Sequence, residues 1–231
     1  MRTVIIHGQG HKGSTYHIAH GLAEKIGGEI TEFFLPRDFG EFCLGCTKCF
    51  GTDASACPHY GKLRPLTEAI DAADVIILES PVYVYHATGA MKAFLDHYGW
   101  RWMVHRPEPS MFRKQGVCVA TAAGAGMKST MRDMADSLFF WGVARQYHLG
   151  AAVRAVSWET VSDRTKARLE KKTSALADKI RRRNGKVRPG LRTRAFFCLM
   201  RMLQKKGGLG NGLDPRHWEK QGWLGKARPW K

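Results

Sequence analysis

The 231-residue sequence lacks any uninterrupted apolar run that approaches the roughly 20 residues of a membrane-spanning helix. It also lacks a signal-peptide pattern, because the first residues, MRTVIIHG, have the composition of a core strand. A disulfide framework belongs to small secreted domains and is not favoured in a chain of this size. We therefore expect a cytoplasmic protein whose cysteines remain reduced.

Acidic residues are scarce in one part of the chain only. Residues 1–150 contain 15 Lys+Arg and 14 Asp+Glu, whereas residues 151–231 contain 22 and 6, so a basic tail carries nearly all of the net charge of +17. Nothing in this tail matches a nucleic-acid recognition module, and we expect no specific nucleic-acid partner. A solvated surface, an anionic protein partner and an anionic membrane surface remain open for it.

Apolar segments of strand and helix length alternate along the first two-thirds of the chain. We predict strands at 3–6, 29–35, 75–78, 116–121 and 146–153, and helices at 14–26, 65–72, 89–98, 127–141 and 164–183. Strands separated by helices indicate a parallel sheet covered on both faces. The prediction is an α/β, flavodoxin-like, doubly wound five-stranded domain over residues 1–185. A basic, Trp-containing C-terminal extension follows over 186–231, with an amphipathic helix at 193–206 and a tail too rich in glycine for a helix.

In such a sheet, ligands bind at the carboxyl ends of the strands, which directs attention to the first loop. This loop places G-x-G-x-x-G between a strand and a helix, but no acidic residue ends the second strand to bind a ribose, and Ser14 stands where a Walker A loop has Lys. A cradle for one phosphate monoester is the simpler prediction. The alternative is a glycine-rich turn with a Ser N-cap. The candidate residues are Gln9, His11, Lys12, Gly13, Ser14 and Thr15.

The loops after the third and fourth strands complete this candidate site. An aromatic-rich loop suits a flat ring, although its tyrosines can instead pack into the body. A loop of small residues permits a close backbone approach to a ligand. Together the three loops predict a flavin mononucleotide (FMN) site. The further candidates are Pro81, Val82, Tyr83, Val84 and Tyr85 in one loop and Thr121, Ala122, Ala123, Gly124 and Gly126 in the other.

Four cysteines with C-x2-C-x2-C-x7-C spacing form the strongest chemical signal, namely Cys43, Cys46, Cys49 and Cys57. Such spacing suits an iron–sulfur cluster, with a zinc S4 site as the second interpretation and redox-active or free thiols as the third. Cys118 and Cys198 are expected to be structural. His59, His86 and His97 are expected on loops or helix surfaces, and no Ser/His/Asp set or carboxylate pair stands near the three loops.

Residues 3–155 resemble the flavodoxin-like NAD(P)H-dependent FMN reductases, especially their iron–sulfur flavoprotein branch. The resemblance is carried by the glycine loop ending in GST, the cysteine run, the segment SPVYVYHATGAMKAFLDHYGW, and TAAGAG. It implies that the first loop holds the FMN phosphate, that the SPVY loop holds the isoalloxazine, and that NAD(P)H delivers a hydride to N5. The phosphate loop departs from the family pattern, because Gln9 replaces a Ser and His11 falls near the usual Arg.

The expected function is an FMN-dependent NAD(P)H oxidoreductase that passes electrons, through a [4Fe–4S] cluster where one is held, to a small-molecule or protein acceptor. The alternatives are an electron carrier that does not use NAD(P)H, and a zinc-stabilised binding protein with an anion-binding tail. A homodimer or higher homo-oligomer is expected. Three tail tryptophans suggest that the extension covers the flavin pocket, across a dimer if one forms.

Overall fold

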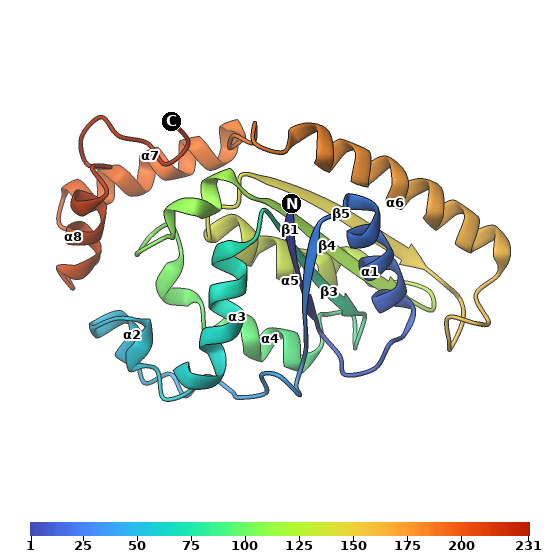
Figure 1. Ribbon diagram of the computed structural model, residues 1–231. Helices are drawn as coiled ribbons and strands as arrows, with labels where there is room; N and C mark the ends of the chain where they lie inside the picture. The colour runs from blue at the N-terminus through green and yellow to red at the C-terminus, as the bar shows by residue number, and fades with distance from the viewer.

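The computed structural model describes all 231 residues, and a five-stranded parallel sheet forms its centre (Figure 1). The strand order is β2-β1-β3-β4-β5, the doubly wound flavodoxin-like order that was predicted. The central strands are buried on both faces, which explains why their sequences are continuous apolar runs and not alternating ones. The strands are β1 (Arg2–His7), β2 (Glu29–Phe34), β3 (Val75–Pro81), β4 (Gln115–Ala122) and β5 (Arg145–Ala152).

Helices cover both faces of the sheet and create two hydrophobic cores. One core lies under α1 (Ser14–Ile26) and α6 (Asp163–Arg183), which contact each other. The other lies under α3 (Tyr60–Ala72), α4 (Gly89–Asp96) and α5 (Met127–Phe140). The short α2 (Lys48–Gly51) belongs to the loop that follows β2. No helix is both long enough and apolar enough to cross a membrane.

The start of α3 differs from the prediction that Pro65 would open this helix. The helix begins at Tyr60, and Pro65 lies inside it. A proline there forfeits one hydrogen bond to the carbonyl four residues earlier, at Gly61. Both Pro65 and Gly61 are exposed, so water can satisfy that carbonyl, while Leu63 packs into the core one turn earlier than expected.

The C-terminal extension, residues 186–231, contains the expected helix α7 (Leu191–Lys205) and an unexpected one, α8 (Leu213–Lys220). The tail was judged too rich in glycine for a helix, but its glycines lie on either side of LDPRHWEK. The side-chain oxygen of Asn211 accepts hydrogen bonds from the amides of Leu213 and Asp214 at 3.1 Å each and so caps the first turn. Pro215 falls in that same turn, where a missing N–H costs nothing.

The extension packs against the amino-terminal rim of the sheet, away from the carboxyl ends of the strands (Figure 1). Trp218 is fully buried, and its indole N–H donates to the carbonyl of His105 at 2.7 Å. Trp223 is also buried, beside Phe112 just before β4. The tail tryptophans are therefore not exposed and do not cover the predicted flavin pocket of their own chain, which corrects that part of the suggestion; cover across a dimer stays a prediction.

Candidate flavin site and cysteine pocket

The loop after β1 leaves the first turn of α1 open to an anion. The N-cap residue of α1 is Gly13, which has no side chain to cap the helix, and Ser14 is the first helical residue. The alternative prediction, a glycine-rich turn with a Ser N-cap, is therefore wrong. First-turn amides have no intrahelical acceptors, and the positive end of the helix dipole adds to their attraction for anions. A phosphate group fits this position.

Side chains around this loop divide into exposed and buried sets. His11 and Lys12 are exposed, and the Lys12 ammonium lies 5.0 Å from the centroid of the Tyr16 ring. Gln9 is buried. The Thr15 hydroxyl is buried and lies 2.6 Å from the Thr121 hydroxyl at the end of β4. Thr15 therefore ties the first loop to the fourth-strand loop.

The loop after β3 is a tight hairpin turn that presents its tip to solvent. Tyr83 and His86 exchange backbone hydrogen bonds at 3.0 Å, and the two residues between them, Val84 and Tyr85, have positive φ angles of 48° and 66°. This backbone is unfavourable for side chains with a Cβ, especially the β-branched Val84. Tyr83 and Tyr85 are about half and two-thirds exposed, so these tyrosines are not anchors packed into the body.

Helix α5 and the phosphate loop hold the hairpin in place. Asp133 of α5 accepts hydrogen bonds from the amide of Ala87 and from His86 Nδ1, both at 3.1 Å. Thr88, which caps α4, donates its hydroxyl proton to the carbonyl of Gly8 at 2.6 Å. At Gly8 itself there is no room for a side chain, because a Cβ would lie 2.8 Å from the carbonyl oxygen of Glu79. The first and third loops are thus locked together.

The loop after β4 packs its backbone against the hairpin. Gly126 has φ of 96°, and a Cβ there would lie 2.5 Å from the Val82 side chain. Ala123 and Gly124 are exposed at the tip, and nothing lies within 4 Å of a Cβ built on Gly124. The three predicted loops therefore meet at one rim, with an open helix N-terminus and exposed aromatic side chains.

A buried chain of histidines and carboxylates beneath this rim was not predicted. His7 is completely buried, and its ring nitrogens each lie 2.9 Å from a carboxylate oxygen, one of Glu79 and one of Glu32. His20 contacts Glu32 at 3.0 Å and continues the chain toward the surface. Burial raises the pKa of the Glu79 carboxyl, an effect that the contact with His7 opposes. The sequence carries one signal of this buried chain, namely a lone glutamate inside the apolar strand VIILES.

The four predicted metal-binding cysteines line one pocket with the end of α4. Cys43 and Cys46 are exposed, whereas Cys49 and Cys57 are half-buried. Burial raises the pKa of the Cys49 thiol, and the neighbouring thiolates of Cys57, Cys43 and Cys46 raise it further. No three of the four sulfur atoms lie within 4.8 Å of one another.

One of the two histidines in the pocket, His97, is placed differently from expectation, whereas His59 lies in the turn before α3, as expected. His97, predicted on a surface, is only 5% exposed, and burial lowers the pKa of its imidazole. His59 is half-buried, and its Nδ1 lies 3.0 Å from Nε2 of His97. Of the remaining cysteines, Cys118 is fully buried as predicted, but Cys198 points to solvent from α7 and is not structural.

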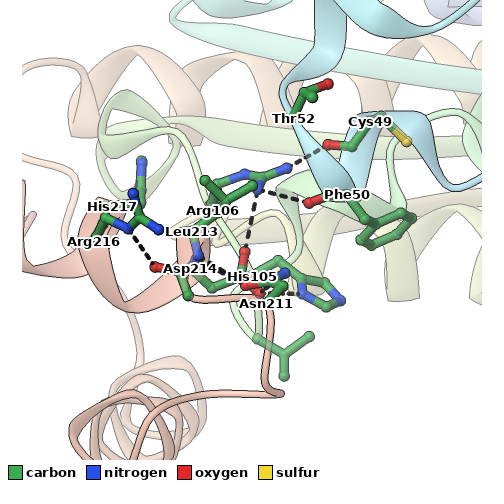
Figure 2. A network of polar contacts seen from close by, with 12 residues as sticks. Cys49, Phe50, Thr52, His105, Arg106, Asn211, Leu213, Asp214, Arg216 and His217 are labelled. Carbon is green, nitrogen blue, oxygen red and sulfur yellow. Dashed lines mark hydrogen bonds and ion pairs between the residues drawn. The ribbon is translucent and has the colours of Figure 1, made fainter.

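An arginine connects the cysteine pocket to the C-terminal extension (Figure 2). Arg106 donates hydrogen bonds to the carbonyl oxygens of Cys49 and Phe50 and lies 3.5 Å from the fully buried carboxylate of Asp214 in α8. The same carboxylate accepts from His105 Nδ1 at 2.8 Å. The extension thereby positions the backbone of the cysteine loop. The net charge of the extension did not indicate this role.

Comparison with known proteins agrees with this architecture. The family model described as NADPH-dependent FMN reductase matches residues 1–154. The chain belongs to this family. An iron–sulfur flavoprotein of Archaeoglobus fulgidus is 26% identical over 121 residues, which are 52% of each chain. A second, from Methanocaldococcus jannaschii, is 33% identical over 75 residues, which are 32% of this chain and 37% of that one.

The solved structures confirm the fold of this family member. An FMN-dependent NADH-azoreductase from Bacillus anthracis, determined in complex with FMN, superposes with a TM-score of 0.56 at 11% identity and covers 77% of this chain and 100% of that one. Such a likeness establishes the shared fold. The matched segment of the chain spans about half or less of the two curated relatives.

Proposed function

We propose that the chain is an FMN-dependent NAD(P)H oxidoreductase. The observation that carries this proposal is the junction of three loops at the carboxyl rim of the sheet, joined through Thr15 with Thr121, Thr88 with Gly8, and Gly126 with Val82. A rim that presents an uncapped helix N-terminus beside exposed aromatic residues fits a phosphorylated flat ring. Bound there, FMN would supply hydride-accepting chemistry toward NAD(P)H and one- or two-electron transfer to an acceptor.

Each loop has its own role in this proposal. The amides of the first α1 turn and Ser14 bind the phosphate, with His11 and Lys12 supplying charge and Gln9 and Gly13 shaping the loop. The hairpin residues 81–85 hold the ring, with their backbone groups at its polar edge and a tyrosine against its face. Residues 121–126 flank the ring on the other side, where Ala122, Ala123 and Gly124 permit close approach.

We further propose that Cys43, Cys46, Cys49 and Cys57 ligate an iron–sulfur cluster. All four cysteines line one pocket, and three of them recur every third residue in one short loop, which suits a [4Fe–4S] cluster that would supply one-electron transfer. Helix α4 begins at the flavin rim and ends at this pocket, and its eight residues span about 12 Å.

The acceptor in this proposal is a small molecule or a protein that approaches either the rim or the exposed cysteines. A second copy of the chain is one candidate cover for the exposed Val84 and Tyr85 at the hairpin tip, in keeping with the expected homodimer. A reducing cytoplasm is the proposed location, because thiolate ligands are lost on oxidation.

Steady-state oxidation of NADH and NADPH, with FMN-loaded chain and a quinone acceptor, tests the activity. Turnover that depends on added FMN supports the proposal. Tight FMN binding without oxidation of either nucleotide would instead identify an electron carrier. Failure to bind FMN, with zinc in the purified protein, would favour the zinc-stabilised binding protein.

A further inference from the structure

Two histidines beside the cysteine loop have the geometry of metal ligands. His97 Nδ1 lies 2.8 Å from the carbonyl oxygen of Ala93, so this nitrogen carries the proton and Nε2 presents a lone pair. A ring fixed in this way by a backbone carbonyl is the usual outer-shell arrangement of a metal-bound histidine. Phe39 packs edge-on against the ring at 4.8 Å between centroids and restricts its rotation.

The histidine pair converges with one thiol on a single point. His59, which precedes α3, and His97, which follows α4, approach to 3.0 Å, and the ligand atoms of Cys57 and both histidines lie within 4.8 Å of one another. The sequence Cys57-Pro58-His59 supplies two of these ligands from positions two residues apart on one short turn. One thiolate with two imidazoles is a donor set that suits Zn²⁺ and leaves a fourth position for water or another thiol.

We propose that Cys57, His59 and His97 form a mixed sulfur–nitrogen site that binds a single divalent transition-metal ion, such as Zn²⁺, in the chain that carries no cluster. Cys57 serves either this ion or the cluster, so the two occupants exclude each other. The site does not depend on flavin binding.

Metal titration of the iron-free, FMN-free chain tests this site, with Zn²⁺ measured by competition against a chelator and Co²⁺ by absorption. One ion per chain is expected. His59→Gln and His97→Gln should each weaken Zn²⁺ binding on the order of a hundredfold. Cys43→Ser should bind Zn²⁺ like the unaltered chain, and His148→Gln, which alters an exposed histidine on β5, is the control. Circular dichroism establishes that each variant is folded.

Reconstitution with iron and sulfide separates the two donor sets. His59→Gln should retain the iron and sulfide content of the unaltered chain, whereas Cys43→Ser should lose it. Zinc binding that disappears in Cys43→Ser but persists in both histidine variants would overturn the mixed site in favour of four thiolates. Absence of stoichiometric Zn²⁺ binding would also overturn it. Neither result bears on the flavin proposal, because FMN affinity is measured separately.

A second observation concerns α7, which is apolar on two opposite faces. One face, with Phe197 and Met200, is buried against the body. The opposite face exposes Leu191, Leu199 and Met202 by 84%, 51% and 56%, at spacings that place them on one stripe of a 3.6-residue helix. Leu209, just beyond the helix, is 59% exposed.

Lysines flank this apolar stripe and have no acidic partners. Lys205 and Lys206 border the groove formed by Leu199, Met202 and their neighbours, and neither makes an ion pair. Residues 186–231 contain twelve Lys and Arg residues but only two acidic ones. A second copy of the chain would bring like charges together across this face, and a nucleic acid would leave the apolar stripe uncovered. An anionic lipid surface satisfies both the stripe and the cations.

We propose that this outer face of α7 lies in the plane of an anionic membrane surface. Because α7 packs at the amino-terminal rim, the flavin rim then faces away from the lipid (Figure 1). Vesicle co-sedimentation tests the proposal, with phosphatidylcholine vesicles that contain or lack phosphatidylglycerol. Binding should require the anionic lipid, weaken as salt is added, and fall on the order of tenfold or more in Met202→Glu. Val156→Glu, at a fully exposed apolar residue outside the extension, is the matched control.

Two outcomes would overturn membrane binding. One is the absence of co-sedimentation with anionic vesicles. The other is equal binding by Met202→Glu and the unaltered chain, which would show that charge alone accounts for it. Size-exclusion chromatography of the same variants shows whether the face joins two copies. A dimer that Met202→Glu dissociates, without lipid binding, would assign the stripe to self-association.

Discussion

Replacement of Asp214 by asparagine should weaken both the fold and the order of the cysteine loop. The Asp214 carboxylate is fully buried, pairs with His105 at 2.8 Å, and lies 3.5 Å from Arg106, whose side chain is one-tenth exposed. Removal of one partner from a buried ion pair typically costs about 3–5 kcal/mol, because the other charge stays buried without compensation. Arg106 keeps its two carbonyl acceptors, so we expect a loss of about 2–3 kcal/mol in the free energy of unfolding.

Urea denaturation of the metal-free chain measures this loss. The matched control is Glu219→Gln, which removes an exposed acid from the same helix and should change the unfolding free energy by less than about 0.5 kcal/mol. Alkylation of Cys49 in the folded, iron-free chain gives a second measure, because Arg106 should restrain the loop less firmly when Asp214 is gone. If Asp214→Asn matches Glu219→Gln in stability and leaves the alkylation rate of Cys49 unchanged, the extension does not position the loop.

Two further predictions concern the flavin rim. Burial raises the pKa of Glu79, so the folded chain holds a proton that the unfolded chain has already released above the ordinary value of 4.5. The free energy of unfolding should therefore fall as pH rises above 4.5. Urea midpoints measured from about pH 5 to about pH 8 should fall less in Glu79→Gln than in the unaltered chain. Parallel pH profiles of the two proteins would contradict this. Gly126→Ala would force a Cβ against Val82 at a positive φ, and we expect FMN affinity to fall on the order of tenfold in a fluorescence titration. Gly61→Ala, in α3 and outside the flavin rim, has open space around its Cβ and is the control. Equal FMN affinities of Gly126→Ala and this control would show that Gly126 does not shape the site.

Local sequence patterns predicted the sheet and the rim because these features depend on short segments. The run Val75–Leu78 is apolar and short, so it forms a buried strand in any doubly wound context. A glycine loop between a strand and a helix places an open helix N-terminus at the carboxyl end of that strand, and all parallel strands end at the same edge. The meeting of the three loops follows from these facts.

Features that depend on distant partners could not be predicted in the same way. His7 and Glu79 are 72 residues apart, and only the pairing of β1 with β3 brings them together. The burial of His97 depends on Phe39, which approaches from the loop after β2. The tail tryptophans lacked an evident partner in the sequence because Phe112, which contacts Trp223 and Trp230, lies in a segment that looks like ordinary core. Contacts between residues that are distant in the sequence determine the burial and the partners of each of these side chains.

The affinity of the purified, flavin-free chain for FMN, compared with its affinity for riboflavin, tests the central claim most directly. Riboflavin has the same ring but no phosphate, so the difference reports the open N-terminus of α1. We predict a one-to-one complex with FMN and weaker binding of riboflavin, on the order of a hundredfold or more. Equal affinity for the two flavins, or no binding of either, would contradict the assignment of this rim as an FMN site.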